Sequence, residues 1–351
     1  MQKTVLISAP KYYGIDTDIK EAFELLGFKT YLINHYPHTI LERIGIKIGN
    51  NLPILKTAVN PWQRASLWKE NAEFISIVSR LKPDLLFIVK GDNIFPETLE
   101  IIKKTVSCPI VGYIWDKPFY AHNANQDDYR RSNFKNGISL YDNILVFDAS
   151  YIDEMIKQGA KYVNYMPLAT NPSRYSNVVV TDKDRNYYKY DVCFIGLPFE
   201  NRIEMFEALS DYNLGVFGDQ WRKHFILKGK TTPLYYRGRA SGETVNIIYL
   251  SSKIVLNIHH LQSIEGLNTR TFDIPVCGAF EIVDYKIIVE RHFEIDNEIV
   301  TFKNIKELKN KITYYLNNDE LRKTIIARGK QRVLSEHTWV HRIKNNLMEL
   351  M

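Results

Sequence analysis

Two acids with an arginine between them stand out in the stretch "IEGLNTRTFDIPVCGAF" (264–280). Glu265 and Asp273 are separated by seven residues, and Arg270 lies among those seven. A carboxylate can accept hydrogen bonds from the neighbouring hydroxyls of a sugar, and a guanidinium can bind a phosphate through two bonds. The pattern indicates a ligand with hydroxyls and phosphates. An acid on a loop and an acid on a helix can also have this spacing by chance, so the surrounding strands and helices must show whether the two acids form a site.

The stretch follows a strand-length apolar run, "KIVLNIHH" (253–260). We expect a short helix over 268–278, because Asn268 is a good residue to begin a helix and Gly278 a good residue to end one. Pro275 removes one helical hydrogen bond, which predicts a helix of only about two turns.

In that geometry the start of the helix would face a ligand. Glu265, on the loop, could accept bonds from two vicinal hydroxyls, and Asp273, one turn into the helix, from a ribose diol. The free amides at the helix start, including those of Gly266 and Leu267, add partial positive charge. His259, at the end of the preceding strand, would lie at the same edge of the sheet.

A second candidate for anion binding is "FIGLPFENR" (194–202). Gly196 follows a strand-like run, and Arg202 lies near the start of a helix. An arginine there can add a charge-assisted bond to the field of the helix N-terminus, which suits a diphosphate. A surface ion pair with Glu200 or Glu204 is the alternative.

Polar clusters also follow strand-like runs in the first half of the chain. We expect these residues at the carboxyl edge of one sheet, where the aromatic ring could stack on a sugar and the charged groups could bind hydroxyls. Helix caps and core packing explain the same residues equally well. The candidates are Gly14, Lys90, Asp92, Trp115 and Asp116.

Strand-like and helix-like segments alternate along the whole chain, which predicts parallel sheets with crossover helices, an α/β fold. A polar segment without periodicity interrupts this series. The expected parts are a Rossmann-like domain over 1–170, a linker over 171–189, a second Rossmann-like domain over 190–335 and a final helix over 336–351. Open α/β sheets bind ligands at the carboxyl ends of their strands, so two such sheets with a cleft between them predict two ligands.

Composition sets wider bounds. The 351 residues are 45% hydrophobic, but no apolar run approaches the roughly 20 residues of a bilayer-spanning helix. Three cysteines that lie far apart indicate neither a disulfide framework nor a thiolate zinc site. The first residues lead straight into a strand-like run, so we expect no secretory signal and a cytoplasmic location. The net charge of +6 is small.

For two further segments, the sequence is compatible with more than one binding partner. Residues 218–239 carry six Lys or Arg against one Asp, which fits a solvated basic face or a groove for an anionic ligand. Residues 38–69 are basic and aromatic. They could rest on anionic lipid at the inner face of the membrane, or form an ordinary interdomain loop.

The stretch 265–278 resembles the Glu-x7-Glu region of retaining GT-B glycosyltransferases, with "DIPVCG" in place of a segment like "EAxACG". The order of several runs resembles the CgeB-like branch of these enzymes more closely. Those runs are "KPDLLFIVKGD" (82–92), "WDKP" (115–118), "YDNILVFDASYIDEMIKQGAKYVNYMPLATNP" (141–172), "SSKIVLNI" (251–258), "FDIPVCGAFEIVDY" (272–285) and "LRKTIIARGKQRVLSEHTWVHR" (321–342).

This resemblance implies a GT-B fold of two facing Rossmann-like domains, with the nucleotide-sugar donor on the second and the acceptor on the first. By match, Glu265 would contact the donor sugar, Asp273 the ribose, and Arg202 and Arg270 the diphosphate. Asp273 departs from the family's Glu by one methylene. The resemblance further implies retention at the anomeric carbon, no bound metal or other cofactor, and a final helix that crosses back to the first domain.

Surface polysaccharide or glycoconjugate synthesis is the expected role, with a glycan, a lipid-linked molecule or another hydroxyl compound as acceptor. Three alternatives remain. An inverting GT-B transferase, including one that acts on modified DNA, would need a base such as Asp116 or Asp92. A nucleotide-sugar 2-epimerase would need no acceptor, and a non-catalytic subunit would only bind the nucleotide sugar. The sequence contains no recognisable nucleic-acid module.

Overall fold

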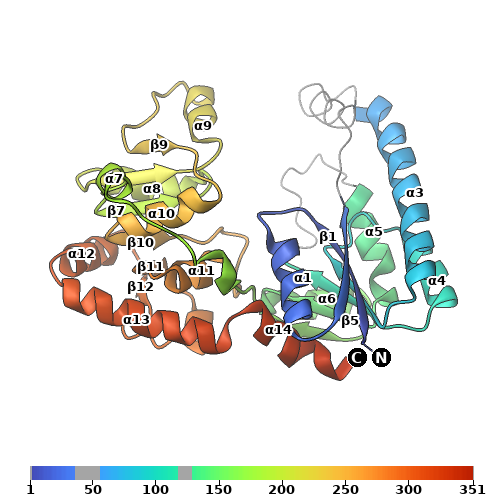
Figure 1. The fold of residues 1–351 in the computed structure, drawn as a ribbon. Coiled ribbons are helices and arrows are strands. Elements are labelled where there is room, and N and C mark those ends of the chain that lie inside the picture. Colours follow the sequence, from blue (N-terminus) through green and yellow to red (C-terminus); the bar gives the residue numbers. More distant parts are fainter. Residues whose placement is uncertain (1, 36–55, 118–128, 351) are drawn as a thin grey trace. The chain divides into compact units, whose positions relative to one another are not determined.

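The computed structural model describes residues 2–35, 56–117 and 129–350 (Figure 1). The chain forms two compact units, each built around one parallel sheet. Unit 1 comprises Met1–Pro167 and Arg342–Met351, and unit 2 comprises Leu168–His341. The predicted α/β class with parallel sheets is therefore confirmed.

Unit 1 has a six-stranded sheet in the order β2-β1-β3-β4-β5-β6. Its strands are β1 (Thr4–Pro10), β2 (Lys29–His35), β3 (Leu85–Val89), β4 (Ile110–Ile114), β5 (Asn143–Val146) and β6 (Val163–Tyr165). Its helices are α1 (Ile15–Leu25), α3 (Lys56–Leu81), α4 (Pro96–Thr105), α5 (Tyr129–Gly137) and α6 (Ile152–Lys157), and α14 (Trp339–Leu347) ends within this unit. Every residue of β3 and β4 is buried, as expected of a parallel sheet with both faces covered.

Unit 2 has a six-stranded sheet in the order β12-β11-β10-β7-β8-β9. Its strands are β7 (Val192–Ile195), β8 (Leu214–Phe217), β9 (Tyr236–Gly238), β10 (Ile254–Asn257), β11 (Glu281–Asp284) and β12 (Val300–Phe302). Its helices are α7 (Asp182–Tyr187), α8 (Glu200–Ala208), α9 (Trp221–Leu227), α10 (Glu243–Ser251), α11 (Arg270–Cys277), α12 (Ile305–Leu316) and α13 (Asp319–Glu336). Short 3-10 helices cover Ile138–Leu140, Ala149–Tyr151, Pro172–Arg174, Ile287–Arg291 and Met348–Leu350.

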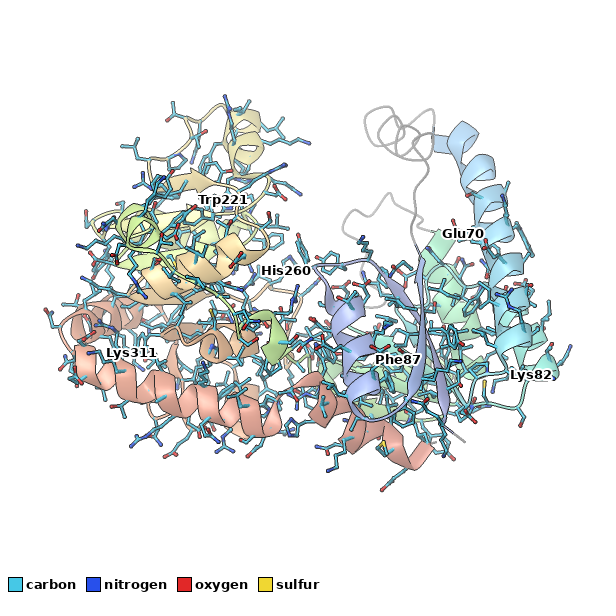
Figure 2. The ribbon with its side chains drawn as sticks, viewed as in Figure 1. Glu70, Lys82, Phe87, Trp221, His260 and Lys311 are labelled. Atoms are coloured by element: carbon cyan, nitrogen blue, oxygen red, sulfur yellow. The ribbon has the colours of Figure 1, made fainter. Side chains whose placement is uncertain are left out.

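The sheet of unit 2 has a hydrophobic core on each face, because successive strand side chains point to opposite sides. Val192 and Phe194 of β7 pack in a cluster that includes Trp221 of α9. Cys193, between them, packs in a second cluster with Ile274 of α11. Figure 2 shows Trp221 within this unit and Phe87 of β3 within the core of unit 1. The alternation in β7 therefore seats α11 on one face of the sheet.

Several elements differ from the expectation. The segment read as an aperiodic linker contains α7, which Thr181 and Asp184 begin with a reciprocal capping box. The basic segment 218–239 contains α9 and the edge strand β9. The helix α3 begins at Lys56, so the basic and aromatic segment 38–69 runs into a helix. Residues 38–55 of the proposed lipid-contact segment lie outside the described residues.

Local turn chemistry ends α11 where the sequence predicted, whereas the helix begins one residue later than expected, with Thr269 at its N-cap. Gly278 ends the helix with φ at 91°, a left-handed conformation that favours glycine. Asn268 precedes the helix, and its Oδ1 accepts a hydrogen bond from the amide of Thr271 at 3.3 Å. The helix has eight residues with Pro275 inside it, in agreement with the predicted two turns.

Across the described residues, no helix is both long and apolar enough to cross a bilayer.

Candidate functional site

The sheet of unit 2 changes its winding direction between β7 and β10. These two strands are neighbours, and their successors lie on opposite sides, with β8 beyond β7 and β11 beyond β10. In open α/β sheets a ligand binds outside the carboxyl ends of the strands at such a switch point. Here those ends are Ile195 and Asn257.

Arg202, in the first turns of α8, reaches this point from a buried position and is only 3% exposed. It donates to the carbonyl oxygen of Leu197 at 3.0 Å and to that of Ile258 at 2.6 Å. The guanidinium lies 4.7 Å from the ring centre of Phe199. Burial, reinforced by the charge of Arg270, lowers the pKa of Arg202 to about 9. The group is therefore a poorly solvated cation at neutral pH.

Arg270, the first residue of α11, reaches the same strand ends from the other side. Its Nε donates to Oδ1 of Asn257 at 3.1 Å, and its Nη1 donates to the carbonyl oxygen of Ile195 at 3.2 Å. Within the described residues, every hydrogen bond that the guanidinium groups of Arg202 and Arg270 donate thus goes to a neutral oxygen. Two cations at one switch point without a bonded carboxylate create a site for an anion.

Asn257, the last residue of β10, organises the surroundings of Arg270. Its side chain is fully buried. Its Nδ2 lies 2.8 Å from Oε1 of Glu281 and 3.1 Å from Oγ1 of Thr271, and its Oδ1 accepts from Nδ2 of Asn268 at 2.8 Å. Sequence reasoning missed Asn257 and Glu281. A signal was present in the sequence, since each is a polar residue at one end of a short strand with an apolar interior.

His259 belongs to this framework rather than to an open ligand surface, because it is only 2% exposed. Asp284 Oδ1 accepts from the His259 backbone amide at 2.7 Å and lies 2.8 Å from His259 Nδ1. Burial lowers the pKa of His259, so the ring is neutral and donates from Nδ1 to the carboxylate. Burial opposes ionisation of Asp284, but its contacts with His259 outweigh this and lower the pKa of Asp284. His259 Nε2 lies 3.4 Å from Oγ1 of Thr271.

Glu265 is half-buried in the loop between β10 and α11. Hydrogen bonds from Ser263 and Lys286 help to hold this loop. Ser263 Oγ donates to the carbonyl oxygen of Gly266 at 2.7 Å, and Lys286 Nζ donates to that of Ile264 at 3.3 Å. Leu267 is fully buried and is a core residue, so only its backbone can serve a ligand.

Asp273 has a structural partner that the sequence did not predict. Thr170 Oγ1 donates to Asp273 Oδ1 at 2.6 Å, and the Tyr175 hydroxyl also donates to this carboxylate. Burial raises the pKa of Asp273, and these hydroxyls oppose part of the rise. Asp273 is therefore bonded to the segment that enters unit 2, whereas Glu265 lies on the loop ahead of α11.

Gly196 lies directly after β7, where two backbones approach closely. A Cβ on Gly218, which follows β8 with φ at 141°, would collide with the carbonyl oxygen of Gly196. Trp221 Nε1 donates to that same oxygen at 2.7 Å. The loop after β7 is therefore fixed in place. The ring of Phe199, farther along it, meets that of His260 edge-on at 4.1 Å between centroids; Figure 2 labels His260 in the loop after β10.

The first-half candidates lie at the carboxyl edge of the sheet of unit 1, as the sequence predicted. Lys90 follows β3, Asp116 follows β4, and the two form an ion pair at 2.5 Å. Asp92 lies two residues after Lys90, and its carbonyl oxygen accepts from Asn133 at 3.1 Å. Gly14 precedes α1 with φ at 80°.

Trp115 does not offer the open ring that the sequence suggested. It is only 5% exposed, whereas Tyr12 and Tyr13, in the loop after β1, are 50% and 71% exposed. The rings of Tyr12 and Trp115 are 6.1 Å apart. Among the described residues named here, the exposed aromatic rings at this edge are therefore those of the two tyrosines, which the sequence prediction did not include. No grouping of three or more metal-binding side chains occurs among the described residues.

Comparison with known proteins extends these findings. Residues 202–348 match the glycosyl transferase-like family. The spore protein CgeB of Bacillus subtilis is 23% identical over 290 residues, which are 77% of this chain and 84% of that protein.

Two solved structures show the fold. Sucrose-phosphate synthase from Thermosynechococcus elongatus superposes with a TM-score of 0.66 at 13% identity, covering 99% of this chain and 98% of that one. HepE from Anabaena, in complex with UDP-glucose, superposes with a TM-score of 0.61 at 10% identity, covering 98% of each chain. The chain is a glycosyltransferase with the GT-B fold. In this glycosyltransferase the family match begins at Arg202, the buried cation at the switch point.

Proposed function

We propose that this glycosyltransferase moves a sugar from a nucleotide diphosphate to an acceptor hydroxyl, with retention of configuration at the anomeric carbon. The observation that carries the proposal is the pair Arg202 and Arg270, whose hydrogen bonds within the described residues all go to neutral oxygens. A buried cation is costly unless an opposite charge compensates it. A diphosphate at the ends of β7 and β10 would supply that charge.

The donor class follows from the same site. The diphosphate would accept bonds from both guanidinium groups and from the backbone amides at the starts of α8 and α11. The Anabaena structure in complex with UDP-glucose supports a nucleotide sugar as the donor. Gly196, Gly266, Leu267 and Asn268 would line this ligand, mainly through their backbones.

Glu265 is proposed to hold hydroxyls of the donor sugar, since it lies on the loop ahead of α11. Asp273 is proposed to bind the ribose. This binding requires the ribose hydroxyls to replace the Thr170 hydroxyl, which now donates to the carboxylate. The acceptor is proposed to lie at the edge of unit 1 formed by Gly14, Lys90, Asp92, Trp115 and Asp116.

Retention needs no strong protein base in front-face attack. The bond between the anomeric carbon and the phosphate oxygen breaks, the acceptor oxygen bonds to the same face, and the departing phosphate oxygen takes the acceptor's proton. The protein must then stabilise negative charge that grows on the diphosphate. Removal of one preorganised donor of this kind typically raises the barrier by about 2.7–4 kcal/mol.

Substitution of the two arginines tests the proposal. Arg202→Met and Arg270→Met should each lower turnover on the order of a hundredfold or more. Arg291→Met, on an exposed arginine of the same unit, is the matched control and should retain full turnover. Wild-type turnover in both site variants would refute the assignment.

Donor and stereochemistry need separate assays. A thermal-shift screen of nucleotide sugars identifies the donor, since a ligand at a hundred times its Kd stabilises the fold by about 2.7 kcal/mol. NMR of the product then gives the anomeric configuration, and an inverted product would favour the inverting alternative. Conversion of the donor without acceptor would indicate a 2-epimerase, and binding without turnover a non-catalytic subunit.

A further inference from the structure

A buried glutamate lies beneath the anion site. Glu281 begins β11, is 3% exposed, and pairs in register with Val255 of β10. An apolar side chain would fill such a position in the middle of a sheet at no electrostatic cost. Burial of a carboxyl group costs several kcal/mol unless hydrogen bonds compensate, so its presence calls for a role.

The one side-chain hydrogen bond that Glu281 makes within the described part of the chain points to that role. Glu281 Oε1 accepts from Asn257 Nδ2 at 2.8 Å, and Asn257 Oδ1 in turn accepts from Arg270 Nε at 3.1 Å and from Asn268 Nδ2 at 2.8 Å. Within the described residues, Oε2 of Glu281 is buried without a hydrogen-bond partner. The Glu281 contact, the shortest of those that Asn257 Nδ2 makes, thus favours the orientation of the amide that keeps its oxygen toward Arg270.

We propose that Glu281 is a positioning residue of the anion site, which orients Arg270 through Asn257 and whose charge weakens nucleotide binding when it ionises. The inference rests on the proposed function, because it takes the ligand of Arg270 to be the donor diphosphate. Glu281 touches neither the ligand nor the reacting atoms and acts through its neighbours.

The groups around Glu281 support this coupling. Burial raises the pKa of Glu281 to about 8, and the bond from Asn257 and the charge of Arg270 oppose the rise. The charges of Asp273 on α11 and Asp284 on β11 add to it. The carboxyl group is mostly neutral at pH 7 and becomes charged as the pH rises through about 8.

Ionised Glu281 would place a negative charge behind Arg270, opposite to the bound diphosphate. It would offset the attraction between Arg270 and the ligand, so affinity should fall as the pH rises through this range. By reciprocity, bound nucleotide should hold the proton on Glu281 more tightly. A rise of one unit in the pKa of Glu281 on binding corresponds to about a tenfold loss of affinity at high pH.

Calorimetric titration with UDP at pH 7.0 and pH 9.0 tests the inference. The wild-type protein should lose affinity on the order of tenfold between the two values. Glu281→Gln retains an oxygen acceptor for Asn257 but cannot ionise, and should lose several-fold less affinity than the wild type. The loss that remains in this variant comes from Arg202, whose pKa of about 9 lies at the upper pH. Glu320→Gln, the same change at an exposed position of α13, should respond as the wild type does.

A second variant tests the positioning. Glu281→Leu removes the nearest of the acceptors of Asn257 Nδ2 and should weaken UDP binding at both pH values, whereas Glu281→Gln at pH 7.0 should bind as the wild type does. Circular dichroism establishes that each variant is folded. If Glu281→Leu does not fold, the difference in pH dependence of UDP binding between Glu281→Gln and the wild type still tests the inference.

The outcomes separate the two proposals. Equal loss of affinity in Glu281→Gln and the wild type would overturn this inference alone, since another group, such as Arg202, would then cause the dependence. Wild-type affinity that does not change with pH would overturn it as well. If the wild type binds no nucleoside diphosphate at pH 7.0, the proposed function fails and this inference fails with it.

Discussion

Replacement of Thr170 by valine should destabilise unit 2, because Thr170 and Asp273 join segments that lie 103 residues apart. Thr170 is only 1% exposed, and its hydroxyl donates to the Asp273 carboxylate at 2.6 Å. Valine has the same shape as threonine, so the substitution leaves no cavity. The loss is confined to one buried hydrogen bond, with the carboxylate left less satisfied.

The expected magnitude follows from that geometry. A hydrogen bond to a charged group contributes about 1.5–3 kcal/mol, and we take about 2 kcal/mol for this short, buried one. In a unit of this size, 1 kcal/mol shifts the melting temperature by about 2–4 °C, so Thr170→Val should melt about 4–8 °C lower. Thr324→Val, on the exposed face of α13, is the control and should melt within about 1–2 °C of the wild type.

A double-mutant cycle assigns the loss to this contact. Thermal unfolding at pH 8 of the wild type, Thr170→Val, Asp273→Ala and the double variant gives the coupling energy between the two side chains. We expect about 1.5–3 kcal/mol, the range for a hydrogen bond to a charged group. Coupling below about 0.5 kcal/mol, the level of additivity between independent sites, would refute the argument that Asp273 anchors the entry to unit 2.

Two further predictions concern the site of unit 2. Gly218→Ala should destabilise the protein by about 3 kcal/mol or more in urea unfolding, since a left-handed φ and a collision with the Gly196 carbonyl act together. The control is Gly229→Ala, at a left-handed glycine with open space around it, which should cost only about 1 kcal/mol. Equal losses of stability in the two variants would show that the collision at Gly218 is relieved. Burial lowers the pKa of His259, so its stability contribution is present above the unfolded value of about 6.5 and is lost as the pH falls through the folded value. Wild-type stability should therefore fall more steeply from pH 7 to pH 5 than that of His259→Gln. Parallel stability profiles would contradict the conclusion that the folded protein holds the His259 ring neutral.

Local signals in the sequence determined the elements that carry the site. Apolar runs of strand length marked β7 and β10, and Asn268, Pro275 and Gly278 marked the start, the length and the end of α11. These signals act over a few residues through turn geometry and helix capping, so they can be interpreted without knowledge of the fold. They were sufficient to place Arg270 at the start of a helix beyond a strand.

The tertiary structure decided which groups meet. The order of the strands places β10 beside β7, and only this pairing brings Arg202 and Arg270 to the same strand ends. It also made Asn257 the centre of a buried network and gave Asp273 its distant partner Thr170. Sequence periodicity specifies which face of a strand is buried, but not which strand lies beside it. Contacts between distant segments therefore depend on how the elements pack.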